Sequence, residues 1–315
     1  MIGDVLISTP LFDILKKKYP QAQIDVLLSP KNHFVLQNDP LIRKRWIYNK
    51  HFLQTISLIR GVRKEKYDFA VDLMDNPSAT STILCLLSGA KETIGLEKEN
   101  SYAYSIAVPL LSRKDSHIIE RIAQLLTPFE IQVRVKDSSI RYTPLESSRK
   151  KADRFLKENF QSDKKIIGIN ISAGGEVRFW GVDHYKHLLE YLHNMYPELQ
   201  IAVFYKPKHR EKAVEIVGSS AAKISPQTNS FDEFAAFIER ISLLITPDTS
   251  AVHLASAFRI PAVVLYVQSN KELRIWEPFN TEYEAIVTDI DDLSTIFEKS
   301  VEEAINRIIK RTGIC

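Results

Sequence analysis

The stretch Thr246–Ala257, TPDTSAVHLASA, follows the largely apolar run Ile241–Ile245, and the two together indicate the fold. The apolar run is typical of a short buried strand, and the small residues after Asp248 favour a helix. The stretch therefore predicts a strand, a tight turn and a helix, with Asp248 at the N-cap position. The first N–H groups of such a helix lack partners within it and lie at its positive end, so the turn is suited to a phosphate. An ordinary strand–helix junction without a ligand explains the same pattern equally well.

The same alternation of apolar runs and helical patterns continues along the chain and predicts an α/β protein with parallel strands. In the first half, strands are expected at Ile24–Leu28 and Phe69–Leu73, and a helix at Thr9–Tyr19. The strands expected in the second half are Lys164–Ile171, Gln200–Tyr205, Leu243–Thr246 and Pro261–Tyr266. A final helix is expected over Leu293–Lys310, and one stripe of it carries the apolar residues Leu293, Ile296, Phe297, Val301, Ala304, Ile305 and Ile308.

The length of 315 residues predicts two domains, which we place at residues 1–150 and 151–315. The boundary falls in the polar segment Val133–Asp163, which contains one charged helix. Parallel α/β domains bind ligands beyond the carboxyl ends of their strands, so we expect functional residues just after strands.

Composition excludes several classes of protein. Hydrophobic residues make up 44% and charged residues 26%, as in ordinary globular proteins, and the net charge of +3 is too small to indicate a nucleic-acid partner. Two cysteines provide neither a disulfide framework nor a metal site. Residues 1–20 lack the apolar core and cleavage pattern of a signal peptide, and no apolar run is long enough to span a membrane. We therefore expect a cytoplasmic protein.

Three segments carry candidate chemistry. Gly3-Asp4 precedes an apolar helix, where Asp4 is either a functional carboxylate or a helix cap. The segment Asn170–Trp180 leaves a strand through Ser172, Gly174 and Gly175, so its backbone can approach a diphosphate while Arg178 supplies a cation. A flexible loop with a solvated arginine is the alternative, and Trp180 is expected to pack in the interior.

The third segment is the stretch quoted first. In it, Thr249 and His253 are four residues apart and share one face of the helix. A buried structural histidine is the simpler interpretation of His253. The other histidines lack metal-ligand spacing, and the carboxylates of Asp289–Asp292 are expected to cap the last helix, so we predict no metal site and no cofactor.

Taken together and in this order, the segments resemble glycosyltransferase family 9, the ADP-heptose:lipopolysaccharide heptosyltransferases. The matching residues are Gly3–Pro10, Tyr67-Asp68, Gly89–Gly95, Arg178-Phe179-Trp180 and Asp248–Ala255. The resemblance covers nearly the whole chain. It implies a GT-B fold of two facing Rossmann-like domains, the first binding the acceptor and the second the nucleotide-sugar.

The resemblance also implies an inverting, metal-independent transfer from an ADP-sugar, with ADP-heptose favoured, to a lipid-linked core oligosaccharide. Asp4 would be the general base, and the donor diphosphate would contact Ser172, Gly174, Gly175, Arg178, Asp248, Thr249, Ser250 and His253. Arg60, Arg63, Lys64 and Arg121 would contact an acidic acceptor, although solvated helix faces explain them equally well. Such an acceptor is compatible with peripheral contact at the inner face of the cytoplasmic membrane.

The chain departs from the family pattern in ways that leave alternatives open. Family members carry a strand before Gly-Asp, so we expect the sheet of the first domain to lack that strand and to be interrupted. Ser250 stands where the family has glycine, and Arg178 stands where lysine is common. A nucleotide-sugar-binding remnant without turnover is the alternative function. A sugar epimerase of the same fold is disfavoured because its catalytic pattern is not evident.

Overall fold

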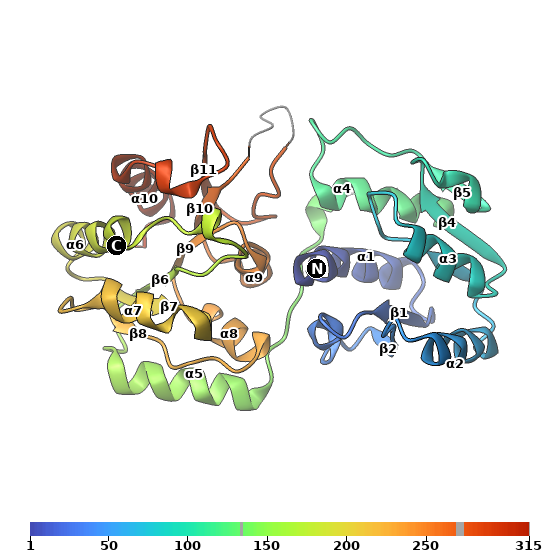
Figure 1. Ribbon diagram of the computed structural model, residues 1–315, viewed down its shortest axis with the longest axis horizontal. Helices are drawn as coiled ribbons and strands as arrows, with labels where there is room; N and C mark the ends of the chain where they lie inside the picture. The colour runs from blue at the N-terminus through green and yellow to red at the C-terminus, as the bar shows by residue number, and fades with distance from the viewer. Residues whose placement is uncertain (133–134, 269–273, 315) are drawn as a thin grey trace. The chain divides into compact units, whose positions relative to one another are not determined.

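The computed structural model describes residues 1–132, 135–268 and 274–314. The chain divides into two compact units: one comprises Met1–Ile140 with a short segment around Arg274, and the other begins at Arg141 (Figure 1). Both units are built from helices and parallel strands, as the sequence predicts. Among the described residues, no helix has the length and apolar character needed to cross a bilayer.

The first unit contains two separate parallel sheets. Its helices are α1 (Ile2–Lys18), α2 (Phe52–Lys64), α3 (Ala79–Leu87) and α4 (Ile118–Ala123), and its strands are β1 (Ile24–Leu28), β2 (Ile42–Ile47), β3 (Phe69–Val71), β4 (Glu92–Leu96) and β5 (Ile106–Val108). Strand β1 pairs with β2, and β3, β4 and β5 form the second sheet in that order. The expected interruption of the sheet is confirmed. Side chains bridge the two sheets, because Tyr67 donates to Asp25 on β1 and accepts from Nε1 of Trp46 on β2 at 2.8 Å.

Helix α1 begins earlier than the sequence pattern predicts. It starts at Ile2 rather than Thr9, so the run Val5–Ile7 is a buried part of the helix. Pro10 lies inside α1 and has no N–H to give to the Leu6 carbonyl, which accepts instead from the Thr9 hydroxyl at 2.7 Å. Asp4 therefore lies in the first turn of α1.

The second unit is a doubly wound α/β domain. Its helices are α5 (Glu146–Asn159), α6 (Val182–Met195), α7 (Arg210–Val217), α8 (Phe231–Ile238), α9 (Ser250–Phe258) and α10 (Glu298–Thr312). Its strands are β6 (Ile166–Asn170), β7 (Gln200–Phe204), β8 (Lys223–Ile224), β9 (Leu243–Pro247), β10 (Ala262–Tyr266) and β11 (Tyr283–Val287). They form one parallel sheet in the order β11-β10-β9-β6-β7-β8.

Helices cover both faces of this sheet, as the buried strands require. On one face, Leu188 of α6, Ile216 of α7 and Ile305 of α10 join the strands in one hydrophobic core. On the other, α8 packs between α5 and α9 and places Phe237 against Phe204 of β7, with ring centroids 6.0 Å apart.

The last helix differs from its prediction. Residues Leu293–Thr295 form a short 3₁₀ turn, and α10 begins only at Glu298. Asp292 accepts from the Ser294 N–H at 2.9 Å and so caps this turn, not the last helix as predicted; the N-cap of α10 is Phe297. Phe297 lies in the extended link before α10 and is 76% exposed, so its place on the buried stripe was predicted wrongly.

Candidate functional site

Two of the predicted segments meet at the carboxyl edge of the six-stranded sheet. Strands β6 and β9 are neighbours, so the residues that follow them come together. At the strand ends, Asn170 Nδ2 donates to Thr246 Oγ1 at 2.9 Å and to the Ser172 carbonyl at 3.2 Å. All three residues are buried. These hydrogen bonds fix the loop after β6 against the turn after β9.

Ser172 is held by the chain itself. Its Oγ accepts from the Lys206 N–H at 2.8 Å, and it lies 2.9 Å from Nδ1 of His209. The serine hydroxyl can either donate to Nδ1 or accept from it, depending on the histidine tautomer. Ser172 thus ties the loop after β6 to the segment after β7, and its predicted donor contact stays a prediction.

His209 and the lysines around it were missed by the sequence analysis. Burial lowers the pKa of His209 below its ordinary value, and Lys208 and Lys212 lower it further, while Glu176 opposes them. The segment Lys206–His209 follows β7 directly, so the rule that points to residues just after strands could have found it.

Arg178 and Asp248 lie side by side. A short 3₁₀ turn, Glu176–Arg178, presents the arginine, whose Nη1 lies 3.3 Å from the Asp248 carbonyl oxygen and 3.5 Å from Oδ2. Burial raises the pKa of the Asp248 carboxyl above its ordinary value, and Arg178 partly offsets this. The Arg178 side chain is 41% exposed, and a guanidinium has further N–H donors beyond the one that bonds the Asp248 carbonyl.

The turn after β9 is capped one residue later than predicted. Thr249, not Asp248, is the N-cap of α9: its backbone is extended, and its Oγ1 accepts from the Ala251 N–H at 3.2 Å. Asp248 is instead anchored by its own N–H, which donates to the Leu265 carbonyl at 2.9 Å. Ser250 is the first residue of α9, and its side chain is half-buried. The predicted strand, turn and helix are confirmed, with the start of α9 beside Arg178.

His253 is a buried residue of α9. Across residues 1–132, 135–268 and 274–314, no group of three or more His, Cys, Asp or Glu side chains is arranged to hold a metal ion. His253 therefore belongs to no such group, and its predicted contact with the diphosphate stays a prediction.

Gly174 and Gly175 are not required by the protein's own packing. A Cβ built at either position would meet no described atom within 4 Å. The space beside this backbone is open, as the predicted approach of a diphosphate requires.

Trp180 packs in the interior, as predicted. It is fully buried, donates from Nε1 to the Ile296 carbonyl at 2.9 Å, and stacks on His184 with centroids 5.1 Å apart. It fixes the end of the loop that carries Arg178.

In the first unit, Asp4 lies in the first turn of α1. Its Oδ2 accepts from the amino group of Met1. Its Oδ1 has no hydrogen-bond partner within the described part of the chain. That oxygen is buried.

The predicted acceptor cations occupy two different settings. Arg60, Arg63 and Lys64 are exposed on α2, and Arg63 Nε donates to the Leu87 carbonyl at 3.0 Å. Arg121 on α4 is buried, with Nη1 2.6 Å from Asp75 Oδ2 and Nε donating to the Leu111 carbonyl. Whether these four residues bind an acceptor stays a prediction.

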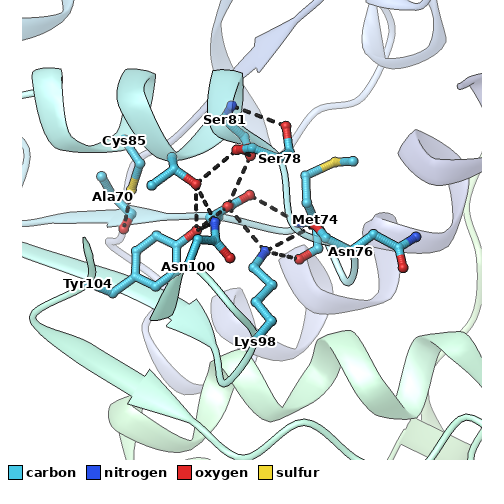
Figure 2. A network of polar contacts seen from close by, with 11 residues as sticks. Ala70, Met74, Asn76, Ser78, Ser81, Cys85, Lys98, Asn100 and Tyr104 are labelled. Carbon is cyan, nitrogen blue, oxygen red and sulfur yellow. Dashed lines mark hydrogen bonds and ion pairs between the residues drawn. The ribbon is translucent and has the colours of Figure 1, made fainter. Parts of the chain in front are cut away.

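A buried polar network at the carboxyl ends of β3 and β4 was not predicted (Figure 2). Oδ2 of Asp72 accepts from Tyr104 Oη at 2.5 Å, Ser81 Oγ at 3.0 Å and Lys98 Nζ at 3.3 Å. Lys98 also donates to the carbonyls of Met74 and Asn76. Burial and the hydrogen bond to Asp72 raise the pKa of Tyr104. The network fixes the loop after β3.

The comparison with known proteins decides the family. The profile of glycosyltransferase family 9 (heptosyltransferase) matches residues 55–305. The chain belongs to this family. It is therefore a glycosyltransferase, and its two Rossmann-like units are those of the GT-B fold.

Individual relatives agree with the family assignment. Lipopolysaccharide heptosyltransferase 3 of Escherichia coli is 25% identical to this glycosyltransferase over 293 residues, which is 88% of this chain and 84% of the relative. The crystal structure of a family 9 glycosyl transferase from Veillonella parvula superposes with a TM-score of 0.84 at 21% identity, over 99% of this chain and 95% of the other. The E. coli heptosyltransferase WaaC with ADP gives 0.77 at 14% identity, over 100% and 97% of the two chains.

Proposed function

We propose that this glycosyltransferase transfers heptose from ADP-heptose to an inner-core sugar of lipopolysaccharide, with inversion and without a metal. The observation that carries the donor side is the meeting of Arg178 with the start of α9 at one sheet edge. A cation and a helix N-terminus together suit a diphosphate. The relatives add support, since one is a lipopolysaccharide heptosyltransferase and another was solved with ADP.

The chemistry needs a base, a leaving group and stabilisation of the charge that develops. The acceptor hydroxyl oxygen attacks the anomeric carbon while the bond from that carbon to the diphosphate oxygen breaks. The electron pair of the broken bond leaves with ADP, and the proton of the acceptor hydroxyl passes to the Asp4 carboxylate. Arg178 and the N–H groups at Thr249 and Ser250 stabilise the negative charge growing on the diphosphate.

The acceptor is assigned by its charge. An inner-core oligosaccharide is acidic and lipid-linked, and it would be bound in the first unit by the exposed Arg60, Arg63 and Lys64 of α2. Arg121 is enclosed with Asp75 and would act by holding the loop after β3 in place. On this assignment the protein works at the inner face of the cytoplasmic membrane.

A panel of nucleotides and nucleotide-sugars tests the donor. We expect ADP and ADP-heptose to raise the unfolding temperature of the full chain, and UDP- and GDP-sugars to leave it unchanged. Stabilisation by UDP compounds alone would reject the ADP donor. Stabilisation by ADP-heptose with no transfer to any core acceptor would indicate the binding-only alternative.

A further inference from the structure

The first turn of α2 carries two large apolar side chains that the fold leaves in solvent. Phe52 is 79% exposed and Leu53 is 78% exposed. Scattered exposed apolar residues are ordinary on a protein surface, but two adjacent large ones that share a helix face with several cations are typical of an interfacial helix.

The exposed cations of α2 lie on the same side of the helix as this pair. Positions 52, 56, 60 and 63 recur every three or four residues, as do positions 53, 57, 60 and 64, so Phe52 and Leu53 share a face with Arg60, Arg63 and Lys64. Leu58, on the opposite side, is buried. No acidic residue occurs in α2. The next carboxylate, Glu65, is turned toward Arg43 and Lys44, at 2.9 and 2.8 Å.

A second group of exposed apolar residues lies on α3, which meets α2 at the basic end of that helix. The hydrogen bond from Arg63 Nε to the Leu87 carbonyl joins the basic end of α2 to the end of α3. Three more exposed apolar side chains lie on α3 at helical spacing, Ile83, Leu86 and Leu87. We call this set of residues from α2 and α3 the α2–α3 face.

The chemistry of the α2–α3 face fits one kind of partner. Apolar side chains enter the boundary between headgroups and acyl chains, and cations without neighbouring carboxylates attract anionic headgroups. A second copy fits poorly, because a two-fold contact through this face would set Arg60, Arg63 and Lys64 against their own counterparts. We propose that the α2–α3 face docks this glycosyltransferase onto an anionic lipid bilayer. The proposal rests on the proposed function, in which the acceptor is lipid-linked.

Vesicle sedimentation tests the docking surface. The purified full chain should sediment with phosphatidylcholine vesicles that contain about one-third phosphatidylglycerol and much less with pure phosphatidylcholine, and added salt should release it. The double variant F52S/L53S should bind anionic vesicles at least about tenfold more weakly, because the inserted apolar area is lost. Phe297→Ser is the matched control, since Phe297 is a similarly exposed aromatic residue of the second unit. Its binding should equal that of the unaltered protein.

Three results would overturn the proposal. In the first, F52S/L53S binds anionic vesicles as well as the unaltered protein does. In the second, F52S/L53S and Phe297→Ser lose vesicle binding equally. In the third, the unaltered protein binds anionic and neutral vesicles equally. Light scattering adds a fourth, because a dimer that F52S/L53S dissociates would make this face a contact between copies.

The docking proposal and the proposed function fail separately. F52S/L53S should keep the thermal stabilisation by ADP, because neither residue belongs to the second unit. If ADP-heptose stabilises the protein but vesicles do not bind it, the docking proposal is wrong and the proposed function stands. If vesicles bind but ADP compounds do not stabilise the protein, the donor assignment fails and the docking surface stands.

Discussion

The two units position their candidate residues by different means. In the second unit they follow buried strands of one continuous sheet, and interior hydrogen bonds such as Asn170 to Thr246 hold them. In the first unit, Asp4 and the cations of α2 stand on helices beside two short sheets. Strand ends and interior hydrogen bonds thus hold the proposed donor residues in place, whereas the proposed acceptor residues depend on individual side chains of helices.

The strands show the same contrast. Every residue of β6, β9 and β10 is buried, whereas Phe69 and Val71 of β3 are exposed. Packing alone therefore does not fix the loop after β3. The buried pairs Lys98–Asp72 and Arg121–Asp75 hold it instead. We expect substitutions in the first unit to change transfer or stability without changing donor binding.

The largest expected effect is on transfer. Asp4→Asn removes the proposed base while keeping size and polarity, so turnover should fall by about 10²–10⁴-fold. The affinity for ADP, measured by calorimetry, should stay unchanged because the proposed donor site lies in the second unit. Near-normal turnover would show that Asp4 is not the base. A loss of ADP affinity as large as the loss of turnover would contradict the expectation that the first unit acts in transfer and the second in donor binding.

A buried charge in the first unit should matter more than an exposed one. Lys98→Met leaves Asp72 buried without its cation, and breaking a buried pair in this way costs about 3–5 kcal/mol of unfolding free energy. Lys91→Met is the matched control, because Lys91 pairs with Asp68 in solvent and its loss should have little effect. Urea denaturation measures both, and equal effects would refute the role given to the Lys98–Asp72 pair.

The donor side should respond to the geometry of its cation. Arg178→Gln should weaken ADP binding by about tenfold or more, because a charge-assisted hydrogen bond contributes about 1.5–3 kcal/mol. Arg178→Lys keeps the charge but loses the planar guanidinium. Its affinity for ADP should therefore lie between those of the unaltered protein and Arg178→Gln. Calorimetry with ADP measures the series. An unchanged affinity in Arg178→Gln would place the diphosphate elsewhere.

The smallest expected effect is a pH dependence of stability. The pKa of His209 in the folded protein lies below its ordinary value of 6.5, so the unfolded chain takes up its proton first as the pH falls. The contribution of His209 to the free energy of unfolding is therefore full above about pH 6.5. It declines below that pH until His209 is protonated in the folded protein as well. His209→Gln should flatten the decline of unfolding temperature between about pH 7.5 and 5 by a few degrees at most. An unaltered slope would show that another group sets it.

Part of the site was predictable because strand ends are readable in sequence. The apolar runs before Asn170 and Asp248 located both segments of the candidate donor site, and the small residues after Asp248 located α9. Boundaries were less certain, since caps depend on backbone angles. Thr249 takes the cap instead of Asp248, and α10 starts at Glu298 instead of Leu293. The position of His209 after β7 could be read from the sequence, but its contact with Ser172 could not, because the two residues are distant in the chain.

The sequence alone determined the α/β class, the parallel strands and the family resemblance, because periodicity and short motifs are local properties. Only the tertiary structure decided which polar residues are buried together. The pairing of Lys98 with Asp72, the enclosure of Arg121 and the bond from Ser172 to His209 join residues far apart in the chain. Burial sets the energy of such contacts, and burial is a property of the packed chain rather than of any one segment.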